Sequence, residues 1–590
     1  MPRDRLPSPR SPSADWRTSL RKLLKKTFGL RQLRAGQDAA IDSVMAGRPT
    51  LAAMPTGAGK SLCYQLPALL LPGATVVVSP LIALMKDQCD KLRELGIDAV
   101  QLNSAVPADE AEAAEAAIAD GRAKIIFTTP ERLADNDFLD TLASQRTSLL
   151  VVDEAHCISQ WGHDFRPAFL EIGGAIERLG RPTILALTAT ATDAVIDDIA
   201  EQLGVGRFNV INTGMYRPNL HYRVLQVTNE DDKLARAVSI VSTSEGPGLV
   251  YAATVKGAEA VHAALVEAGI DAGLYHGKLG ASARREQQDA FMEGRARVMV
   301  ATNAFGLGID KPDTRFVLHY QMPGGLDAYY QESGRAGRDG EDAECTLLFL
   351  HSDKAVQQFF LAGKYPARED VADLYGALQR RSAERGEEPW TLATLQQALD
   401  RPQAKLQVAL RLLRHQRVVR QDAEGRLALT REGLDADALE KLLTTYREKR
   451  ERDREMLERM VFYGQTGHCR WKVLLQNFDE AEQLTSCGSC DNCGRMAAAF
   501  AAAEADGREQ AGNDAEPPPQ QARAATAFEP GEAVTVPRYG HGLVEQSAAE
   551  GVTVVFPGGS RRLFLPSFVR RAERRRGGQQ KLPQALREAA

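Results

Sequence analysis

The sequence has no long hydrophobic run and no excess of positive charge. No apolar stretch approaches the ~20 residues that a membrane-spanning helix requires, so we expect no membrane segment. The formal net charge is −5 over 590 residues, which argues against a uniformly basic surface for binding nucleic acid. With 44% hydrophobic and 26% charged residues, the composition is typical of a globular protein.

The N-terminus lacks the apolar core of a secretory signal. Residues 1–20 begin with MPRDRLPSPRSPSADW, which is rich in Pro, Ser and Arg and predicts a disordered arm. We therefore expect the protein in the cytoplasm, associated with the nucleoid. Two local runs, RKLLKKTFGLRQLR and RRLFLPSFVRRAERRR, are basic, and each is either a solvated face or a patch that binds phosphates.

The chain is too long for one hydrophobic core. Two consecutive segments, 21–207 and 208–351, alternate short apolar runs such as TVVVSP, SLLVVDEAH and TRFVLHY with amphipathic helical stretches. Strands that are apolar throughout and separated by helices are typical of a parallel sheet covered on both faces. The predicted fold class is therefore α/β, with two parallel-sheet domains and a cleft between them.

The strands stop after the second of these segments. Residues 365–440 are expected to form helices followed by a short hairpin around AEG, which is the element order of a winged helix; an all-helical packing module is the alternative. Residues 441–496 contain a charged helix and a group of cysteines, and 497–525 are a linker rich in Ala and Pro. Residues 526–573 show short alternating strands with PG and PGG turns, which predict a small β-barrel, and 574–590 form a basic tail.

Four of the eight cysteines follow the pattern C-x17-C-x2-C-x2-C. Four thiolates at this spacing leave no position for water and predict a closed structural Zn²⁺ site. A redox role for one C-x2-C pair would leave the other cysteines unexplained. The ligands would be Cys469, Cys487, Cys490 and Cys493, and we expect chelation to unfold this segment while the α/β domains stay folded.

The stretch AAMPTGAGKSLCYQLP lies after an apolar run and before a helical one. Gly57 and Gly59 allow its backbone to curl so that N–H groups face phosphate oxygens at a helix N-terminus, where Lys60 neutralises charge and Ser61 ligates Mg²⁺. Met54 occupies the position of the first glycine in the usual phosphate-loop pattern. A glycine turn capped by serine is the alternative, so a second motif has to decide.

That motif is VVDEAHCISQWGHDFRP, which begins as a buried strand. Asp153 emerges at the carboxyl end of the strand, where α/β sheets bind ligands, and is placed to hold Mg²⁺. Glu154 beside it is placed to polarise the attacking water. Adjacent carboxylates at a strand end often only cap a helix, but capping does not explain a phosphate loop upstream in the same sheet. Together the two motifs predict hydrolysis of a nucleoside triphosphate.

The second α/β domain carries an arginine pair in YYQESGRAGRDG. Arg335 and Arg338 are one helical turn apart and can point at one target. Arginines projected onto a γ-phosphate stabilise the charge of the transition state. An exposed basic turn is the alternative, which Gly334 and Gly337 disfavour because they permit a close approach.

These motifs resemble the RecQ family of superfamily 2 DNA helicases. FGLRQLRAGQ is similar to the family's adenine-recognition motif, MPTGAGKS to motif I, SPLIALMKDQ to motif Ia, DEAH to motif II and LTATAT to motif III. ATNAFGLGIDKPDTRFVLHY and QESGRAGRDG are similar to motifs V and VI. The resemblance covers about Phe28 to Leu350 and the cysteine cluster. It implies two RecA-like domains and a 3′–5′ DNA helicase of recombination and repair that uses ATP, Mg²⁺ and Zn²⁺.

By the same resemblance, Gln37 reads the adenine base through its amide, with Arg34 beside it. Two positions of this motif depart from the family, because Leu30 stands where an aromatic residue is usual and Ala35 replaces the usual proline. LVYAATVKG also departs from motif IV, so no site residue is assigned there.

CISQWGHDFRPAF is similar to the family's aromatic-rich loop, which links base stacking to hydrolysis by the neighbouring carboxylates. The alternative is a single apolar helix face, because three of its aromatic residues are spaced by four. A glycine and a proline inside the stretch argue against an unbroken helix. The DNA-binding residues would be Trp161, His163, Phe165 and Arg166, with Phe169 as the third aromatic of that spacing.

The order of the modules differs from the family's usual order, because the winged-helix-like segment precedes the cysteine cluster. The final segment is similar to the small barrel of UvrD-type helicases, which implies docking of duplex DNA or of a partner protein. We expect an ATP-dependent helicase that acts on single-stranded and duplex DNA. The alternatives are a nucleic-acid-stimulated ATPase or translocase that does not separate strands, and a DNA-binding recruitment protein.

Overall fold

The computed structural model describes most of the chain between residues 16 and 571. Outside the description are residues 1–15, 160–166, 190–191, 306–310, 366–367, 384–389, 402, 416–417, 423–424, 431–435, 481–483, 511–527, 537–539, 549–550, 557–560, 565–568 and 572–590. Contacts divide the chain into two compact units, Met1–Ala499 and Phe500–Ala590. None of the helices in the described part combines the length and apolarity needed to cross a membrane.

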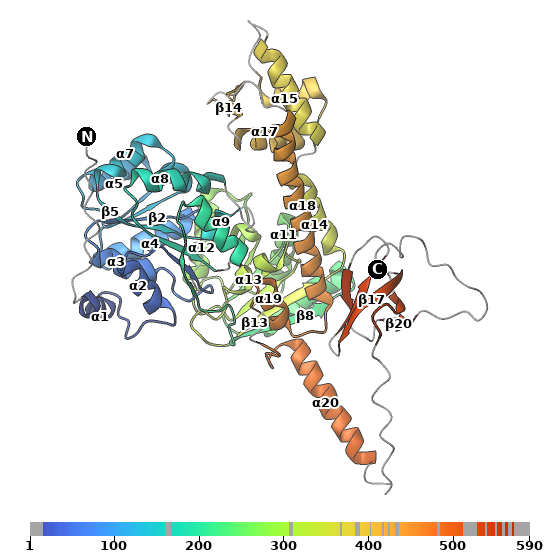
Figure 1. Cartoon of the computed structure of the whole chain (residues 1–590). Coiled ribbons are helices and arrows are strands. Elements are labelled where there is room, and N and C mark those ends of the chain that lie inside the picture. Colours follow the sequence, from blue (N-terminus) through green and yellow to red (C-terminus); the bar gives the residue numbers. More distant parts are fainter. Residues whose placement is uncertain are drawn as a thin grey trace. The chain divides into compact units, whose positions relative to one another are not determined.

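The first α/β domain is a seven-stranded parallel sheet in the order β3-β4-β2-β5-β6-β1-β7, with helices on both faces (Figure 1). Its strands are β1 (Thr50–Ala53), β2 (Ala74–Val78), β3 (Ala99–Leu102), β4 (Ile125–Thr128), β5 (Thr147–Val152), β6 (Thr183–Thr188) and β7 (Asn209–Asn212). Its helices are α1 (Trp16–Lys26), α2 (Gln37–Met45), α3 (Leu62–Leu70), α4 (Ile82–Glu94), α5 (Ala108–Ala119), α6 (Pro130–Leu133), α7 (Asn136–Ser144), α8 (Ile172–Arg178) and α9 (Asp193–Gln202).

Apolar residues on both faces of each strand explain the two helical layers. In β5, Leu150 and Val152 belong to one buried core, whereas Leu149 and Val151 belong to the core on the opposite face. Because neighbouring side chains of a strand point to opposite faces, an unbroken apolar run has to be covered on both sides. The last strand, β7, pairs with β1, so the first sheet extends to residue 212.

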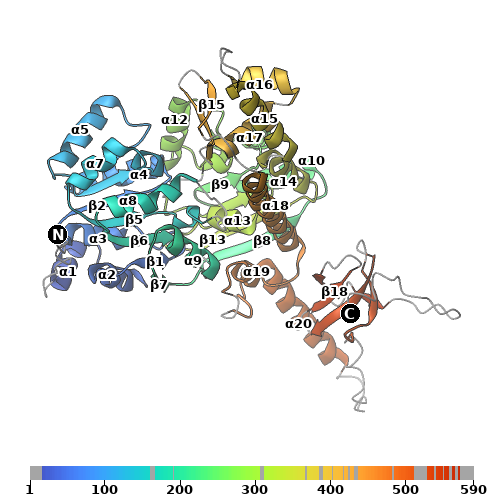
Figure 2. The same cartoon turned by 45° about the horizontal axis from the view of Figure 1, so that its top comes forward.

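The second α/β domain is a six-stranded parallel sheet in the order β10-β11-β9-β12-β13-β8 (Figure 2). Its strands are β8 (Leu220–Gln226), β9 (Gly248–Tyr251), β10 (Ala272–Tyr275), β11 (Val298–Ala301), β12 (Phe316–His319) and β13 (Ala343–Phe349). Its helices are α10 (Glu230–Thr243), α11 (Val255–Glu267), α12 (Ala281–Met292) and α13 (Leu326–Ser333). The predicted pair of α/β domains is confirmed.

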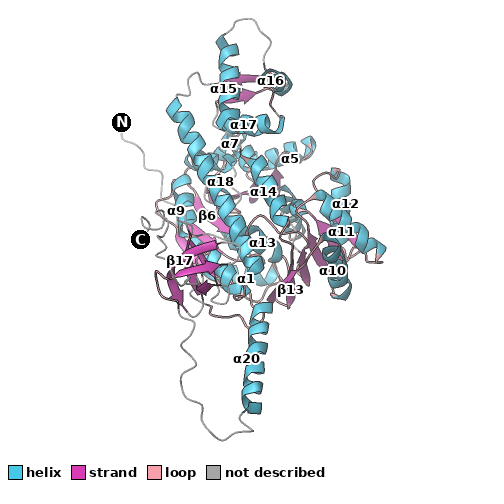
Figure 3. Cartoon of the chain, turned by 90° about the vertical axis from the view of Figure 1, so that its right-hand side faces the viewer, coloured by secondary structure: helices cyan, strands magenta, loops and turns pink. Residues whose placement is uncertain are grey.

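Two helices that follow the second sheet, α14 (Asp353–Lys364) and α18 (Ala436–Gln465), lie side by side (Figure 3). Between them the chain forms α15 (Arg368–Ala383), α16 (Leu392–Leu399), α17 (Gln403–His415), β14 (Val419–Gln421) and β15 (Leu427–Leu429). An isolated antiparallel bridge joins Trp390 to Leu427. Helix, bridge, two helices and hairpin is the element order of a winged helix, and that identification stays a prediction.

The cysteine-rich segment continues from α18 through α19 (Arg470–Asn477) into α20 (Asp491–Gln510). Its buried residues, including Trp471, Leu474 and Cys490, lie in the same hydrophobic core as Leu220 and Tyr222 of β8. Among its described residues the segment has no core of its own, and it packs directly on the second sheet.

The C-terminal unit contains a five-stranded antiparallel sheet in the order β19-β18-β17-β16-β20. Its strands are β16 (Ala533–Val536), β17 (Gly540–Ala548), β18 (Gly551–Val555), β19 (Arg561–Phe564) and β20 (Arg570–Arg571). Within the described residues, β19 and β20 are the two edges and do not pair with each other. The predicted strands are present, but closure into a barrel is not shown.

Candidate functional site

The phosphate loop connects β1 to α3, and two of its residues must be glycine. Gly57 and Gly59 have φ angles of +85° and +79°, in the left-handed region that favours glycine. Space imposes the same requirement: a Cβ on Gly57 would lie 2.9 Å from Cγ of Arg338, and one on Gly59 would lie 2.6 Å from Nε2 of Gln37. The loop is therefore in contact with the second domain on one side and with α2 on the other.

Lys60 follows the glycines and lies near both predicted carboxylates. Its Nζ donates to the carbonyl of Met54 at 3.1 Å. Burial lowers the pKa of Lys60, while the charges of Glu154 and Asp153 oppose this shift and that of Arg338 adds to it. The four charged groups that the sequence assigned to triphosphate chemistry are thus close enough to influence one another.

The predicted magnesium ligands Ser61 and Asp153 are held by neighbouring polar side chains. Ser61 Oγ accepts a hydrogen bond from Nε2 of Gln88 at 2.9 Å, and Oδ2 of Asp153 accepts one from Oγ of Ser79 at 3.3 Å. Burial, reinforced by the charge of Glu154, raises the pKa of Asp153 to about 7. A divalent cation would favour the ionised carboxylate, so the donor set and its electrostatics fit Mg²⁺.

Glu154 adopts a backbone conformation that is uncommon for a residue with a side chain. Its φ angle is +50°, and such left-handed residues often occur at functional sites. Oε2 is buried without a hydrogen-bond partner among the described residues, with Nδ1 of His156 at 3.4 Å. His156 Nδ1 is also 3.1 Å from Oγ1 of Thr188, at the end of β6, which connects the acid pair to the LTATAT segment.

Gln37 uses both ends of its side-chain amide within the protein. Nε2 donates to the carbonyls of Ala58 and Gly59 at 3.0 and 2.9 Å, and Oε1 accepts from the backbone N–H of Arg34 at 2.8 Å. The Arg34 guanidinium donates to the carbonyl of Gly57. The two residues predicted to read adenine therefore also hold the phosphate loop.

The predicted arginine pair follows α13 in the second domain. Arg338 lies against Gly57 of the phosphate loop, since its Cγ would be only 2.9 Å from a Cβ at that position. Arg335 lies near Tyr251: burial raises the pKa of this tyrosine to about 12, and the charge of Arg335 opposes the shift. The arginines thus face the phosphate loop and the carboxyl end of β9, respectively.

Arg217, in the linker between the two sheets, is a residue that sequence patterns did not single out. Its guanidinium donates to the carbonyls of Gly334, Ala336 and Gly337 at 2.6 to 2.7 Å. It therefore holds the backbone of the segment that carries the arginine pair. The sequence offers no periodic or motif signal for such a contact, because it joins segments far apart in the chain.

The four clustered cysteines fit a structural zinc site. Their Sγ atoms all lie within 4.8 Å of one another, and those of Cys487 and Cys493 are 3.9 Å apart. Tetrahedral zinc with Zn–S bonds of ≈2.3 Å requires sulfurs about 3.8 Å apart. Backbone N–H groups of Cys487 and Cys493 donate to Cys469 and Cys490 at 3.3 and 3.5 Å, which suits thiolate ligands.

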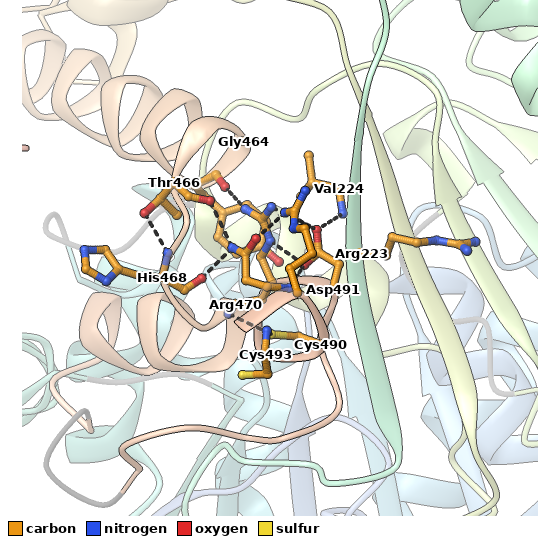
Figure 4. A network of polar contacts seen from close by, with 12 residues as sticks. Arg223, Val224, Gly464, Thr466, His468, Arg470, Cys490, Asp491 and Cys493 are labelled. Carbon is orange, nitrogen blue, oxygen red and sulfur yellow. Dashed lines mark hydrogen bonds and ion pairs between the residues drawn. The ribbon is translucent and has the colours of Figure 1, made fainter. Parts of the chain in front are cut away.

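A buried ion pair fastens this cluster to β8 (Figure 4). Arg470, whose side chain is 2% exposed, pairs with Asp491 at 2.9 Å, and Asp491 also accepts from the backbone N–H of Val224 in β8 at 3.2 Å. Nε1 of Trp471 donates to the carbonyl of Leu220 at 3.0 Å. The metal segment and the second sheet are therefore joined by polar bonds as well as by a shared core.

The residues predicted to contact DNA lie outside the described part of the chain. Trp161, His163, Phe165 and Arg166 fall in the segment 160–166. Phe169, just beyond it, is 1% exposed and belongs to the core of the first domain. The four-residue spacing of the aromatics therefore includes one core residue, Phe169, in addition to residues of the predicted loop.

A hollow of about 710 Å³ lies at the carboxyl edge of the second sheet. Its lining includes Lys256 at the start of α11, Lys278, Thr302 after β11, and Phe360 of α14. Neither lysine forms an ion pair with a described residue, and Phe360 is 44% exposed. Positive charge and an exposed aromatic ring are thus present on one concave surface.

Comparison with known proteins identifies both α/β domains. Residues 34–199 match the model for the DEAD/DEAH box helicase domain, and residues 232–340 match the helicase conserved C-terminal domain. Among solved structures, the DNA-bound DUF1998 helicase MrfA overlaps with a TM-score of 0.48 at 18% identity, over 73% of this chain and 60% of that chain. The sheets, the phosphate loop and the matched family models define a helicase of the DEAD/DEAH box class.

The cysteine segment and the curated relatives narrow this class. Residues 433–494 match the RecQ zinc-binding model. The probable ATP-dependent DNA helicase RecS of Bacillus subtilis is 35% identical over 485 residues, which are 81% of this chain and 92% of that protein. The ATP-dependent DNA helicase RecQ of the same organism is 46% identical over 354 residues, 60% of each chain. The chain belongs to the RecQ family of ATP-dependent DNA helicases.

Proposed function

We propose that this chain moves 3′ to 5′ along single-stranded DNA and separates duplexes in recombination and repair at the nucleoid, driven by ATP hydrolysis. The contact of Arg338 with Gly57, beside Lys60 and the carboxylates of Asp153 and Glu154, carries the proposal. A triphosphate on this loop would be contacted from both domains. Its hydrolysis would therefore alter the contact between them, which is how chemistry becomes movement along a strand.

Each predicted site residue has a role in this proposal. Lys60 and the N–H groups around Gly57 and Gly59 bind phosphates, and Glu154 orients the attacking water. Arg335 and Arg338 neutralise the charge that develops in the transition state. Gln37 and Arg34 hold adenine by replacing their hydrogen bonds to the loop carbonyls with hydrogen bonds to the base. Ser61 and Asp153 would hold Mg²⁺, which would neutralise phosphate charge.

The DNA strand has two candidate contacts. The hollow on the second domain offers Lys256 and Lys278 for phosphates and Phe360 for stacking on a base, the combination that single-strand binding requires. On the first domain, Trp161, His163, Phe165 and Arg166 follow the acid pair after a short segment, residues 155–160, so bases bound there would be sensed at Glu154. Docking of duplex DNA or a partner protein on the C-terminal sheet stays a prediction.

Strand displacement tests the proposal. We expect unwinding of 3′-tailed DNA, and not of 5′-tailed DNA or tailed RNA, with ATP and Mg²⁺ present. Lys60→Ala is expected to abolish unwinding while retaining DNA binding, whereas Lys91→Ala, at an exposed position of α4, leaves both unchanged. DNA-stimulated ATP hydrolysis without displacement of any tailed substrate would favour the translocase alternative. Unwinding by Lys60→Ala at the normal rate would refute the role of the phosphate loop.

A further inference from the structure

One carboxylate of the zinc segment binds the start of the linker between the two sheets, residues 213–219. Glu480, which follows α19, accepts a hydrogen bond from Nδ2 of Asn212 on Oε1 at 3.0 Å and from the backbone N–H of Met215 on Oε2 at 2.7 Å. Asn212 Oδ1 in turn accepts from the N–H of Gly214 at 2.9 Å, and Gly214 has a φ angle of +77°. Both oxygens of Glu480 thus fix a single tight turn at the point where the chain leaves the first sheet.

The other end of the same linker is bonded to the arginine segment. Arg217 is 9% exposed, and within the described part of the chain its guanidinium donates to backbone carbonyls: those of Gly334, Ala336 and Gly337, and that of Thr56 in the phosphate loop at 3.4 Å. A guanidinium has fixed donor directions. Its position therefore sets the position of the backbone that carries Arg335 and Arg338.

A second linker residue reinforces this contact. Nδ2 of Asn219 donates to the carbonyls of Gly337 and Glu341 at 2.9 and 2.8 Å. Gly337 has a φ angle of +56°, and a Cβ there would lie 2.5 Å from Nδ2 of Asn219. The arginine segment thus fits closely against the linker and has little freedom to move independently of it.

We propose that Glu480 is a positioning residue for ATP hydrolysis: it fixes the linker turn, and through Arg217 it places the segment that carries the two arginines, so that Arg338 lies against the phosphate loop and Arg335 at the carboxyl end of β9. The inference rests on the proposed role of these arginines. The inference connects the zinc segment to ATP hydrolysis, because Glu480 belongs to the segment whose fold the metal stabilises. Glu480 does not touch the nucleotide; two hydrogen bonds and the linker transmit its effect.

The kinetic consequence is specific. Loss of the carboxylate frees the turn, so the arginines spend less time in the position that stabilises transition-state charge, whereas Lys60 and the loop N–H groups still bind ATP. An interaction made only in the transition state changes kcat and leaves KM nearly unaltered. Glu480→Ala is therefore expected to lower kcat for DNA-stimulated ATP hydrolysis about tenfold, with KM for ATP within about twofold of the unaltered protein.

The experiment compares Glu480→Ala with Glu455→Ala, which removes an exposed carboxylate of α18 and should change neither constant. Zinc content and the melting curve are measured on each variant, and Glu480→Asp, with its shorter reach, is measured alongside and should give a smaller fall in kcat. In an Arg217→Lys background, Glu480→Ala should cause little further loss, because both changes act through one linker.

Any of three results with the Glu480 variants would overturn the inference. They are an unchanged kcat in Glu480→Ala, a rise in KM alone, or a fall in kcat that accompanies loss of zinc in both Glu480 variants. Full additivity with Arg217→Lys would also contradict a shared path. Failure of the proposed function is distinguishable, because the unaltered protein would then show no DNA-stimulated hydrolysis.

Discussion

Asp491 offers an internal comparison between a buried and an exposed ion pair. Nε and one terminal nitrogen of Arg470 donate to it at 2.9 and 3.0 Å, and Arg495 donates at 3.2 Å. The side chain of Arg470 is 2% exposed, whereas that of Arg495 is 67% exposed. Asp491→Asn removes the charge that balances Arg470, whereas Arg495→Gln removes only the exposed partner.

The expected costs differ several-fold. Leaving Arg470 buried without its counter-charge should destabilise the zinc segment by about 3–5 kcal/mol, the usual cost of breaking a buried pair. The amide oxygen that Asp491→Asn introduces would still be able to accept from the N–H of Val224, a bond that the carboxylate makes at present. The lost charge therefore accounts for most of the effect. An exposed pair contributes about 0–1 kcal/mol, which is the expected cost of Arg495→Gln.

The assay is urea-dependent release of zinc to a chromogenic chelator, followed together with fluorescence of Trp471, which is fully buried at the same interface. With a slope of about 2 kcal/mol per M urea, Asp491→Asn should lower the release midpoint by about 2 M and Arg495→Gln by less than about 0.5 M. Equal midpoints for the two variants would show that burial does not strengthen the Arg470 pair, and the reasoning would be wrong.

The site, the hollow and the zinc segment each give a further prediction. Asp153 must be ionised to hold Mg²⁺ and its pKa is raised to about 7, so Mg²⁺ affinity should increase with pH up to about 7 and then level off. Because the folded protein holds this proton more tightly than the unfolded chain does, the free energy of unfolding should fall as pH rises from about 4 to about 7. Asp153→Asn should remove both pH dependences. Phe360→Ala should weaken single-strand binding by about 1–3 kcal/mol in an anisotropy titration, whereas Val266→Ala, 52% exposed on α11, should not; equal losses would exclude base stacking at Phe360. Zinc removal should lower the amide protection of the second domain but not that of the first in domain-resolved hydrogen exchange, because the metal segment shares its core with β8. Both α/β domains are still expected to stay folded, as the sequence predicts.

The sequence was sufficient where function follows from a short stretch of chain. Lys60 lies in a glycine loop directly after β1, and Asp153 is the first residue after β5, so strand pattern and motif place both at the carboxyl edge of one sheet. The same holds for the cysteines, because C-x2-C-x2-C brings three sulfurs together whatever surrounds them. These positions depend on local geometry that the residue pattern reports.

The contacts that join distant segments were not predictable in this way. Arg217 meets the carbonyl of Gly337, 120 residues away, and Glu480 meets Met215, 265 residues away. Neither contact has a spacing or a periodicity, since each depends on how two separately folded elements pack. Phe169 illustrates the converse limit, because an aromatic residue in an apolar pattern looks the same whether it fills a core or binds a base.

The long helix α18 links the inserted module to the second domain. Leu443, near its start, belongs to the core formed with α15 and α17, whereas Leu457 and Tyr463 belong to the core shared by the second sheet and the zinc segment. At 1.5 Å per residue, about 21 Å of continuous helix separates Leu443 from Leu457. The intervening residues are mostly charged and can support the helix through pairs such as Arg454 with Glu451 at 3.5 Å. A force on the module is therefore carried along a helix to the core that packs on β8, next to the linker, and not through a flexible tether.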